Sequence, residues 1–541
     1  MSSAPRGAAR ATSGRARKSA SRPKRGGART ATIGRVSIAT LTTAPADSGS
    51  PRPVPRFGIW LIAAAAFCLE LAASGRYGYV RDELYFLAAG RHLAFGYVDQ
   101  PALTPLIARV SAELTGNSLV GLRLVPALGL AALVVATAAM SRLLGAGRTG
   151  QLLAALAAAT CAEFVGAMHE LTTTMPDFVF WAVTLLLVTR LLVSRDPRWW
   201  VAIGACAGVA SEAKWNIAFL VASLGAGFLA TDARRLLASR YLVIGCLIAA
   251  ALAVPDLVWQ AAHGWPNVAV FRALQTQAWH NRATYWPAQV LFTGVALTPL
   301  WVAGLTWTWR NPAARRFRPV AIACALAIAV QFVLGGKPYY SGGAFTFLLA
   351  AGCVPAERWL TAPGRGTGRL MMAIGVMLVS GAALLPVALP VLPASALRTM
   401  PLQKINYDLA ESIAWPRQVA LVARQYRSLP PRRHSHATVL AGNYGEAGAM
   451  DRYGPGYGLP QVYSGANSFW LWGPPPASAT AAIAVNIDPA LLRREFTSVR
   501  LVAVFHNGIG VADDEQGARI YLATGLRTSW QRAWPAFRDC S

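Results

Sequence analysis

The stretch "SGRYGYVRDELYFLAAGRHLAFGYVDQPAL" (residues 74–103) decides how this chain is organised, because it follows directly on the apolar run "FGIWLIAAAAFCLELAA" (residues 57–73). Asp82 and Glu83 stand just beyond that membrane-length run, and Asp99 follows before a proline. Carboxylates beside hydrocarbon are costly, so those found there usually line a cavity or pair with a cation. The simpler alternative is that these acids and their aromatic neighbours only mark the membrane interface.

The composition points to a polytopic membrane protein. Of the 541 residues, 54% are hydrophobic and only 14% are charged, which is too little charge to cover a soluble surface of this size. Apolar segments of roughly 17–25 residues, long enough to cross a hydrocarbon core, recur along the chain up to residue 393. These features exclude a soluble globular protein.

The formal net charge of +27 suggests nucleic acid as a partner at first sight. Its distribution argues against that, since residues 1–56 concentrate Arg and Lys around a single acid, Asp47, among Ala, Ser, Gly and Pro. Such a segment cannot bury a core, and we predict a disordered basic tail on the cytoplasmic side, where anionic lipid headgroups attract it. We therefore expect no nucleic-acid partner.

Arg and Lys clusters at alternate span ends orient the chain, because cytoplasmic loops carry the positive excess. The predicted fold is an α-helical polytopic membrane protein with about eleven transmembrane helices over residues 57–393. Residues 199–231 are predicted to form two short helices, with Glu212 and Lys214 at their outer tip, and residues 258–286 to form an outer loop. The predicted spans are 57–75, 119–141, 151–168, 176–193, the pair within 199–231, 241–257, 287–309, 319–335, 341–356 and 370–393.

Residues 394–541 have a different pattern from the membrane part. Short β-rich runs such as "ATVLAG" and "SVRLVAVF" alternate with Gly/Pro turns, which predicts a small α/β domain. The positive-inside pattern places this domain outside the cytoplasmic membrane, in which the rest of the chain makes multiple passes.

The predicted outer ends of the helices carry a site with two poles. Acids lie near the first outer loops, at Asp82 with Glu83, at Asp99 and at Asp177, which opens a span after Pro176. Cations lie near the later ones, and these are Lys214, Arg282 and Lys337. One pole can accept a proton, and the other can hold a phosphate.

Several blocks in this order resemble bacterial family 39-type membrane glycosyltransferases, which are relatives of the protein O-mannosyltransferases and aminoarabinose transferases. The resemblance runs from about residue 57 to the C-terminus and implies the C-type glycosyltransferase fold. The blocks are "DELYFLAAGRHLAFGYVDQPALTPLIARV", "GLRLVPAL", "HELTTTMPDFVFWA", "GVASEAKWNIAFL", "WQAAHGWPN", "GGKPYYSGGAFTFLLAAG" and "NYGEAGAMDRYGPGYGLPQVYSGANSFWLWGPP".

The resemblance implies transfer of a sugar from a polyprenyl-phosphate donor to a lipid, cell-envelope glycan or protein on the outer face. Asp82 would be the catalytic base, and displacement from the face opposite the leaving group implies inversion. Glu83 would orient it or bind a divalent metal ion, which is the only cofactor that the pattern leaves open. His280 is the other candidate ligand, although a loop histidine is more often satisfied without a metal.

The resemblance also assigns the donor-phosphate and substrate contacts, for which Lys214 and Lys337 look like the family's basic positions. Two residues in these blocks have a plainer interpretation. Lys337 before a proline also suits a lysine that snorkels to the interface, and Arg123 could serve only to neutralise a nearby acid. Relatives often have His-Pro-Pro where this chain has Gln100-Pro101-Ala102, which puts a role for that histidine in doubt. The expected contacts are Asp99, Asp177, Lys214, Arg282, Lys337 and Tyr339.

Two other classes of function compete with the enzyme. A transporter or flippase would share the many spans and would use the acids as proton relays, but such proteins commonly show two similar halves, and no such repeat is found in the sequence. A scaffold that only displays residues 394–541 leaves the Asp82-Glu83 block unexplained.

We predict that a reporter active only in the cytoplasm gives no signal when it is fused after residue 541. The alternating Arg clusters place the N-terminus inside and the C-terminal domain outside. The same reporter fused after Leu144, next to the basic pair Arg142 and Arg148, is the positive control. A strong signal from the fusion at 541 would invert the predicted orientation.

Overall fold

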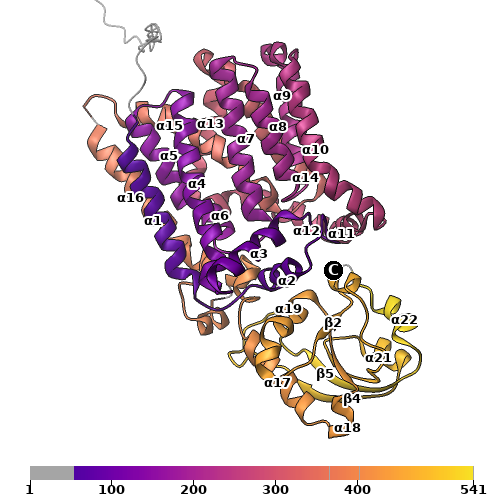
Figure 1. Cartoon of the computed structure of the whole chain (residues 1–541). Coiled ribbons are helices and arrows are strands. Elements are labelled where there is room, and N and C mark those ends of the chain that lie inside the picture. The colour runs from indigo at the N-terminus through magenta and orange to yellow at the C-terminus, as the bar shows by residue number, and fades with distance from the viewer. Residues whose placement is uncertain (1–53, 365, 401, 540–541) are drawn as a thin grey trace, which may run out of the picture. The chain divides into compact units, whose positions relative to one another are not determined.

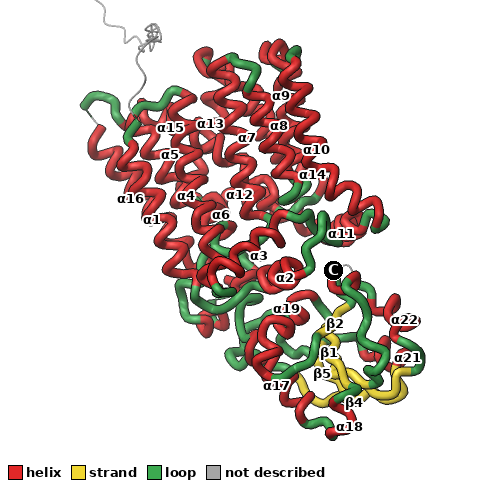
Figure 2. Tube along the Cα trace, viewed as in Figure 1, coloured by secondary structure: helices red, strands yellow, loops and turns green. Residues whose placement is uncertain are grey.

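The computed structural model describes residues 54–539 apart from 365 and 401, within one compact unit, Arg52–Ser541. Almost all of the predicted basic tail, residues 1–56, lies outside the described residues, so its role stays a prediction. Figure 1 shows a bundle of helices followed by a smaller domain with strands, and Figure 2 shows the strands confined to that domain.

The bundle consists of helices α1 to α16. Pairs that are distant in sequence pack side by side, such as α1 against α4, α8 against α10, α9 against α14 and α13 against α15. The helices are α1 (Arg56–Ser74), α2 (Arg81–Arg91), α3 (Leu103–Thr115), α4 (Leu119–Leu144), α5 (Arg148–Thr160), α6 (Ala162–Ala167), α7 (Thr174–Ser194), α8 (Trp199–Ser211), α9 (Ile217–Leu229), α10 (Arg240–Ala262), α11 (Pro266–Leu274), α12 (Ala278–Thr293), α13 (Thr298–Arg310), α14 (Arg318–Leu334), α15 (Phe345–Leu360) and α16 (Gly366–Ala388).

Fewer helices reach membrane length than the sequence analysis predicts. In the described part of the chain, 6 helices are long and apolar enough to cross a membrane, or 7 if one bent pair counts as a single span. The predicted pair within 199–231 is present as α8 and α9, but each has only 13 residues, or about 20 Å of helix, against a hydrocarbon core of about 30 Å. The prediction of about eleven full spans is therefore corrected to this smaller set plus shorter apolar helices.

Two predicted spans are interrupted. The one at 151–168 divides into α5 and α6 at Cys161, whose backbone is extended (φ −72°, ψ 111°). The one at 287–309 bends by 85° at Gly294, whose φ of 95° is left-handed and favours glycine. The predicted outer loop at 258–286 is also wrong, because this segment forms the end of α10, α11 and the start of α12.

The Arg-rich connections gather at one end of the bundle. Asp232 and Arg315 form an ion pair (3.3 Å) that joins the α9–α10 connection to the α13–α14 connection. The Glu357 carboxylate, near the end of α15, accepts hydrogen bonds from the backbone of Gly147 and Gly150 at the start of α5. Helix α4 has 26 residues, or about 39 Å, so its basic end lies a membrane's thickness from its other end, which is next to α2. Which side of the membrane this end faces stays a prediction.

The C-terminal domain is built on a five-stranded mixed sheet in the order β2-β1-β3-β5-β4. Strand β1 is parallel to β2 and β3, whereas β5 is antiparallel to β3 and β4. The predicted α/β domain is thus confirmed. Its elements are α17 (Trp415–Arg427), α18 (Pro431–His434), β1 (Ala437–Ala441), α19 (Tyr444–Tyr453), β2 (Val462–Ser464), α20 (Asn467–Leu471), β3 (Ala481–Val485), α21 (Pro489–Glu495), β4 (Phe496–Val504), β5 (Arg519–Leu526) and α22 (Trp530–Ala533).

Helix α19 attaches this domain to the bundle by packing against α2. The contact needs a glycine, because a Cβ at Gly448 would lie 2.8 Å from the carbonyl carbon of Leu84 on α2. The C-terminal domain is thereby held against the helix that carries Asp82 and Glu83.

We predict that Gly448→Ala lowers the free energy of unfolding by about 1–3 kcal/mol, because the added methyl group must push the two helices apart. Gly456→Ala is the matched control, since nothing lies within 4 Å of a Cβ built there. Thermal unfolding of both purified variants in detergent measures the difference. Equal midpoints would show that α2 and α19 are not in close contact.

Candidate functional site

Asp82 and Glu83 lie in the first turn of α2, where the positive end of the helix dipole favours negative charge. Successive residues on a helix point about 100° apart, so the two carboxylates enter different surroundings. Glu83 is fully buried, whereas Asp82 is half-buried.

Glu83 is held by four hydrogen bonds. Arg123 on α4 donates from Nε to Oε1 (2.9 Å) and from Nη2 to Oε2 (2.8 Å), in a bidentate pair. The backbone amides of Leu171 (3.2 Å to Oε1) and Val80 (3.0 Å to Oε2) complete the set. These four donors occupy both oxygens of the carboxylate, so Glu83 does not fit a metal ligand. Arg123 neutralises the charge of Glu83, as the simpler interpretation of this arginine predicts.

Arg123 extends this cluster to three further segments. Its Nη1 donates to the carbonyl of Ser74 at the end of α1 (3.0 Å), and its Nη2 donates to the carbonyl of Gly78 (2.8 Å). Its Nη1 also lies 3.2 Å from Nε2 of His169, whose Nδ1 lies 3.2 Å from Glu70 on α1. One buried arginine thus ties together α1, α2, α4 and the α6–α7 connection.

Asp82 faces the C-terminal domain. Its Oδ1 accepts a hydrogen bond from the hydroxyl of Tyr444, at the start of α19 (2.9 Å). Among the residues that the structure describes, Tyr444 is the sole hydrogen-bond donor to this carboxylate. The charge of Asp82 also acts on Lys337, Asp99 and Asp408, so several ionisable groups converge here.

The predicted cations Lys214 and Lys337 both lie near the ring of Tyr339. Lys214, in the turn between α8 and α9, has its Nζ 4.3 Å from the ring centroid of Tyr340 and 5.7 Å from that of Tyr339. Lys337, between α14 and α15, has its Nζ 5.8 Å from the centroid of Tyr339. Two ammonium groups that share one aromatic ring repel each other, and an anion placed between them would relieve that repulsion.

Asp177 is linked to Tyr340 through Asn216. It is buried in the first turn of α7, and its Oδ2 accepts a hydrogen bond from Nδ2 of Asn216 (2.7 Å). The same Asn216 nitrogen donates to the carbonyl of Tyr340 (2.8 Å). Asp177 therefore reaches the Lys214–Tyr340 contact through Asn216, in a position to hold it in place.

Asp99 joins the Asp82 side of the site. It lies in the loop between α2 and α3, and its Oδ1 accepts a hydrogen bond from the hydroxyl of Tyr85 (2.7 Å). Burial raises the pKa of Asp99 to about 7, against the opposing effect of the Tyr85 hydrogen bond and with a further rise from the charge of Asp82. Asp99 thus changes its charge near neutral pH.

Arg282 and His280 do not join the site in the contacts that the structure describes. Arg282, on α12, donates from Nε and Nη2 to the carbonyl of Val333 (3.2 and 2.8 Å) and so fastens α12 to the end of α14. His280 is exposed on the same helix. Over residues 54–539, apart from 365 and 401, no three His, Cys, Asp or Glu side chains group so that they could hold a metal ion.

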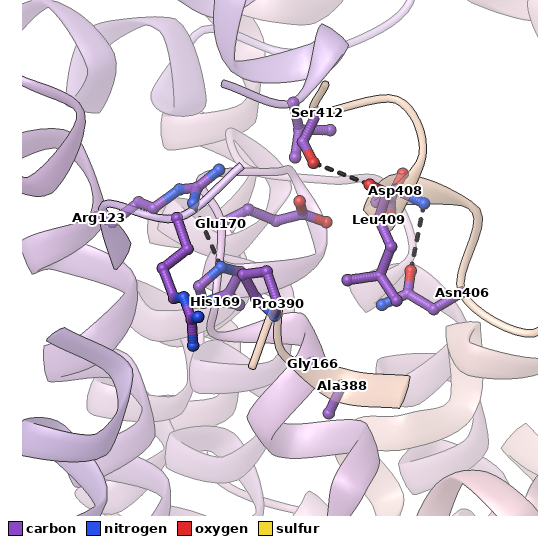
Figure 3. Close-up of a pocket in the computed structure, with 12 residues that line it drawn as sticks. Arg123, Gly166, His169, Glu170, Ala388, Pro390, Asn406, Asp408, Leu409 and Ser412 are labelled. Carbon is purple, nitrogen blue, oxygen red and sulfur yellow. Dashed lines mark hydrogen bonds between the residues drawn. The ribbon is translucent and has the colours of Figure 1, made fainter. Parts of the chain in front are cut away.

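Two further acids lie near this site, Glu170 in the α6–α7 connection and Asp408, which follows the bundle. Both line a small cavity together with Arg76, Asn406 and Ser412, and Figure 3 shows the Glu170 carboxyl group directed toward Asp408. Burial, together with the charge of Asp408, raises the pKa of Glu170. A single sequence holds no signal for this pairing, because the two acids come from distant segments of the chain.

Comparisons with known proteins agree with this architecture. Residues 99–259 match the family described as dolichyl-phosphate-mannose-protein mannosyltransferase. The apo structure of ArnT from Cupriavidus metallidurans aligns with a TM-score of 0.54 at 16% identity, covering 86% of this chain and 98% of that one. The same protein bound to undecaprenyl phosphate aligns with a TM-score of 0.52 at 16% identity, covering 87% and 98%. No curated protein matches the chain.

The bundle and its attached sheet domain therefore have an ArnT-like fold. The family match covers residues 99–259, and the likeness to ArnT extends over most of the chain and concerns its fold. The resemblance seen in the sequence is confirmed. The matched residues begin after Asp82 and Glu83 and end before Lys337, so the roles of those residues rest on the geometry alone.

We predict that Glu83→Gln lowers the free energy of unfolding by about 3–5 kcal/mol, because it leaves the charge of Arg123 buried without a counter-ion. Glu113→Gln is the matched control: it breaks the exposed pair of Arg109 and Glu113 on α3, which contributes at most about 1 kcal/mol. Thermal unfolding in detergent, with and without divalent cations, compares the two. If a divalent cation restored the unfolding midpoint of Glu83→Gln to that of the wild type, the result would instead support Glu83 as a metal ligand.

Proposed function

We propose that this protein transfers a sugar from a polyprenyl-phosphate donor to an acceptor at the membrane face that carries the C-terminal domain. The observation that carries the proposal is the convergence of a half-buried carboxylate, Asp82, and a paired cationic group at one end of an apolar bundle. The ArnT structure solved with undecaprenyl phosphate supports this class of donor.

Lys214 and Lys337 are suited to the donor phosphate. Both ammonium groups lie against Tyr339, and the Nζ of Lys214 also donates to Thr174 (3.3 Å). A phosphate between them would neutralise their mutual repulsion when the donor binds. The same cations would stabilise the charge that develops on the phosphate as it leaves, which makes the bond to the sugar easier to break.

Asp82 is suited to the role of general base. An acceptor hydroxyl attacks the anomeric carbon, the bond from that carbon to the phosphate oxygen breaks, and the hydroxyl proton passes to the Asp82 carboxylate. The hydrogen bond from Tyr444 holds one carboxylate oxygen and leaves the other for the proton. A single displacement of this kind inverts the anomeric configuration. No step in this scheme uses a metal ion.

The position of the basic connections supports an outer location for the reaction. The Arg-rich ends of α4, α9 and α13 lie away from the C-terminal domain, and the positive-inside rule assigns such ends to the cytoplasm. The donor would then present its sugar at the outer leaflet. The acceptor is a lipid, a cell-envelope glycan or a protein.

We predict that Asp82→Asn lowers turnover by about 10²–10⁴-fold, the range for loss of an acid–base group, because the amide cannot take the proton. Asp232→Asn is the matched control, since Asp232 is exposed at the other end of the bundle. The assay follows a label from polyprenyl-phosphate sugars into lipid, glycan or protein in membranes with matched expression. If Asp82→Asn transferred sugar at the normal rate, Asp82 would not be the base, and the role would be assigned to Asp99 or Asp177 instead.

The same assay separates donor binding from proton transfer. Lys214→Ala and Lys337→Ala should raise the KM for the donor, since each removes a positive charge from the phosphate. Arg282→Ala is the control, because the hydrogen bonds of the Arg282 side chain among the described residues go to the carbonyl of Val333, away from the two lysines. Movement of label across vesicles without transfer to any acceptor would favour the flippase.

A further inference from the structure

The side chain of Asn216 joins the two connections that carry the lysines of the proposed phosphate site. Asn216 lies two residues after Lys214, directly before α9, and it is buried. Its Nδ2 donates a hydrogen bond to the backbone carbonyl of Tyr340 (2.8 Å), three residues after Lys337. A buried amide thus links the lysine-bearing turn between α8 and α9 to the lysine-bearing segment between α14 and α15.

Both hydrogens and the oxygen of this amide are hydrogen-bonded. Besides the carbonyl of Tyr340, Nδ2 donates to Oδ2 of Asp177 on α7 (2.7 Å), and Oδ1 accepts from Nε2 of Gln331 on α14 (2.7 Å). The two partners of Nδ2 are acceptors and the partner of Oδ1 is a donor, so the orientation of the amide is fixed. A shift of any of these segments would leave a buried polar atom without a partner, which is costly.

The segment after Lys337 has a second anchor on its other side. Nε2 of Gln289 on α12, which is also buried, donates to the carbonyl of Pro338 (2.7 Å). This bond holds the segment to α12 but does not involve the α8–α9 turn. Among the hydrogen bonds of the described residues, the bond from Asn216 is the one that joins that turn directly to the segment after Lys337.

We propose that Asn216 is a positioning residue for the donor phosphate, because it sets the spacing of Lys214 and Lys337. The inference rests on the proposed function, since it concerns the donor site of that reaction. The Nζ atoms of the two lysines lie 5.7 and 5.8 Å from the ring centroid of Tyr339. If the segment that carries Tyr339 moved relative to the α8–α9 turn, the two ammonium groups would no longer face one phosphate, and the attraction would fall with distance.

A purely structural amide is the competing interpretation. The loss of such an amide would destabilise the bundle and weaken every ligand of the bundle alike. A positioning role predicts a different result, because the lysines attract only the charged phosphate. The loss of affinity would then be confined to lipids that carry a phosphate, and a lipid alcohol of the same length would bind as before.

The experiment compares two lipids that differ only in the phosphate. Undecaprenyl phosphate and undecaprenol are titrated against the full-length protein in detergent, and the ratio of their affinities measures the contribution of the phosphate. We expect the wild type to prefer undecaprenyl phosphate. Asn216→Ala should reduce this preference about tenfold, the scale of weakening one hydrogen bond to a charged group, and should leave the affinity for undecaprenol unchanged.

Asn507→Ala is the matched control. Asn507 is a similarly buried amide in the C-terminal domain, where its Nδ2 donates to the carbonyl of Val511 (2.6 Å) and to Oδ2 of Asp513 (2.7 Å). Its loss should lower the unfolding midpoint without changing the preference for the phosphate.

Two further variants extend the test. If Asn216→Ala does not fold, Gln331→Met takes its place, because it removes one anchor of the Asn216 amide and should reduce the preference about threefold. In a protein that already carries Lys337→Ala, Asn216→Ala should have little further effect, since a second ammonium group is no longer there to be aligned.

The inference is overturned if Asn216→Ala, or Gln331→Met in its place, keeps the wild-type preference or weakens both lipids equally. It is also overturned if the effects of Asn216→Ala and Lys337→Ala simply add. If the wild type itself does not prefer undecaprenyl phosphate to undecaprenol, the proposed donor site is wrong, and this inference falls with it.

Discussion

The buried ion pair of Glu83 and Arg123 is the interaction on which the rest of the site depends. Burying two charges is costly, and the cost is offset only when each charged atom is also hydrogen-bonded. Here the backbone amides of Leu171 and Val80 donate the remaining hydrogen bonds to the Glu83 carboxylate. The carbonyls of Ser74 and Gly78 accept hydrogen bonds from the Arg123 guanidinium. The first turn of α2 is consequently fixed against α1, α4 and the α6–α7 connection. Asp82 is held in place as well, because it is next to Glu83 in the same turn.

The C-terminal domain is part of the site as well as an appended module. Helix α19 packs on α2 through the close contact at Gly448, which brings the Tyr444 hydroxyl to Asp82. Arg81 strengthens the same junction, since its guanidinium lies over the Tyr444 ring and pairs with Asp514. The proposed base, Asp82, would then meet a lipid-borne donor from the side of the bundle and a water-soluble acceptor group from the side of the sheet domain.

Charge is distributed over the site in a way that suits a transfer reaction. Asp82, Asp99, Glu170 and Asp408 gather near the junction, and burial raises the pKa of Asp99, Glu170 and Asp408. The two lysines lie on a separate pair of connections and share an aromatic surface. Keeping some of the carboxyl groups protonated limits repulsion among them and against an incoming phosphate.

The sequence by itself determined the class of the protein, the Arg-rich ends of its helices, the short pair at α8 and α9 and the α/β character of the C-terminal domain. These follow from local composition, hydropathy and charge, which a single segment carries within itself. Only the tertiary structure decided that Glu83 pairs with Arg123 while Asp82 faces the junction with the C-terminal domain. It also decided that Lys214 and Lys337 lie near the same ring, Tyr339, and that Arg282 instead binds the carbonyl of Val333. The tertiary structure also added Tyr444, Glu170 and Asp408 to the site. The sequence could not show them, because a hydrogen bond or ion pair between distant segments depends on packing that no local pattern encodes.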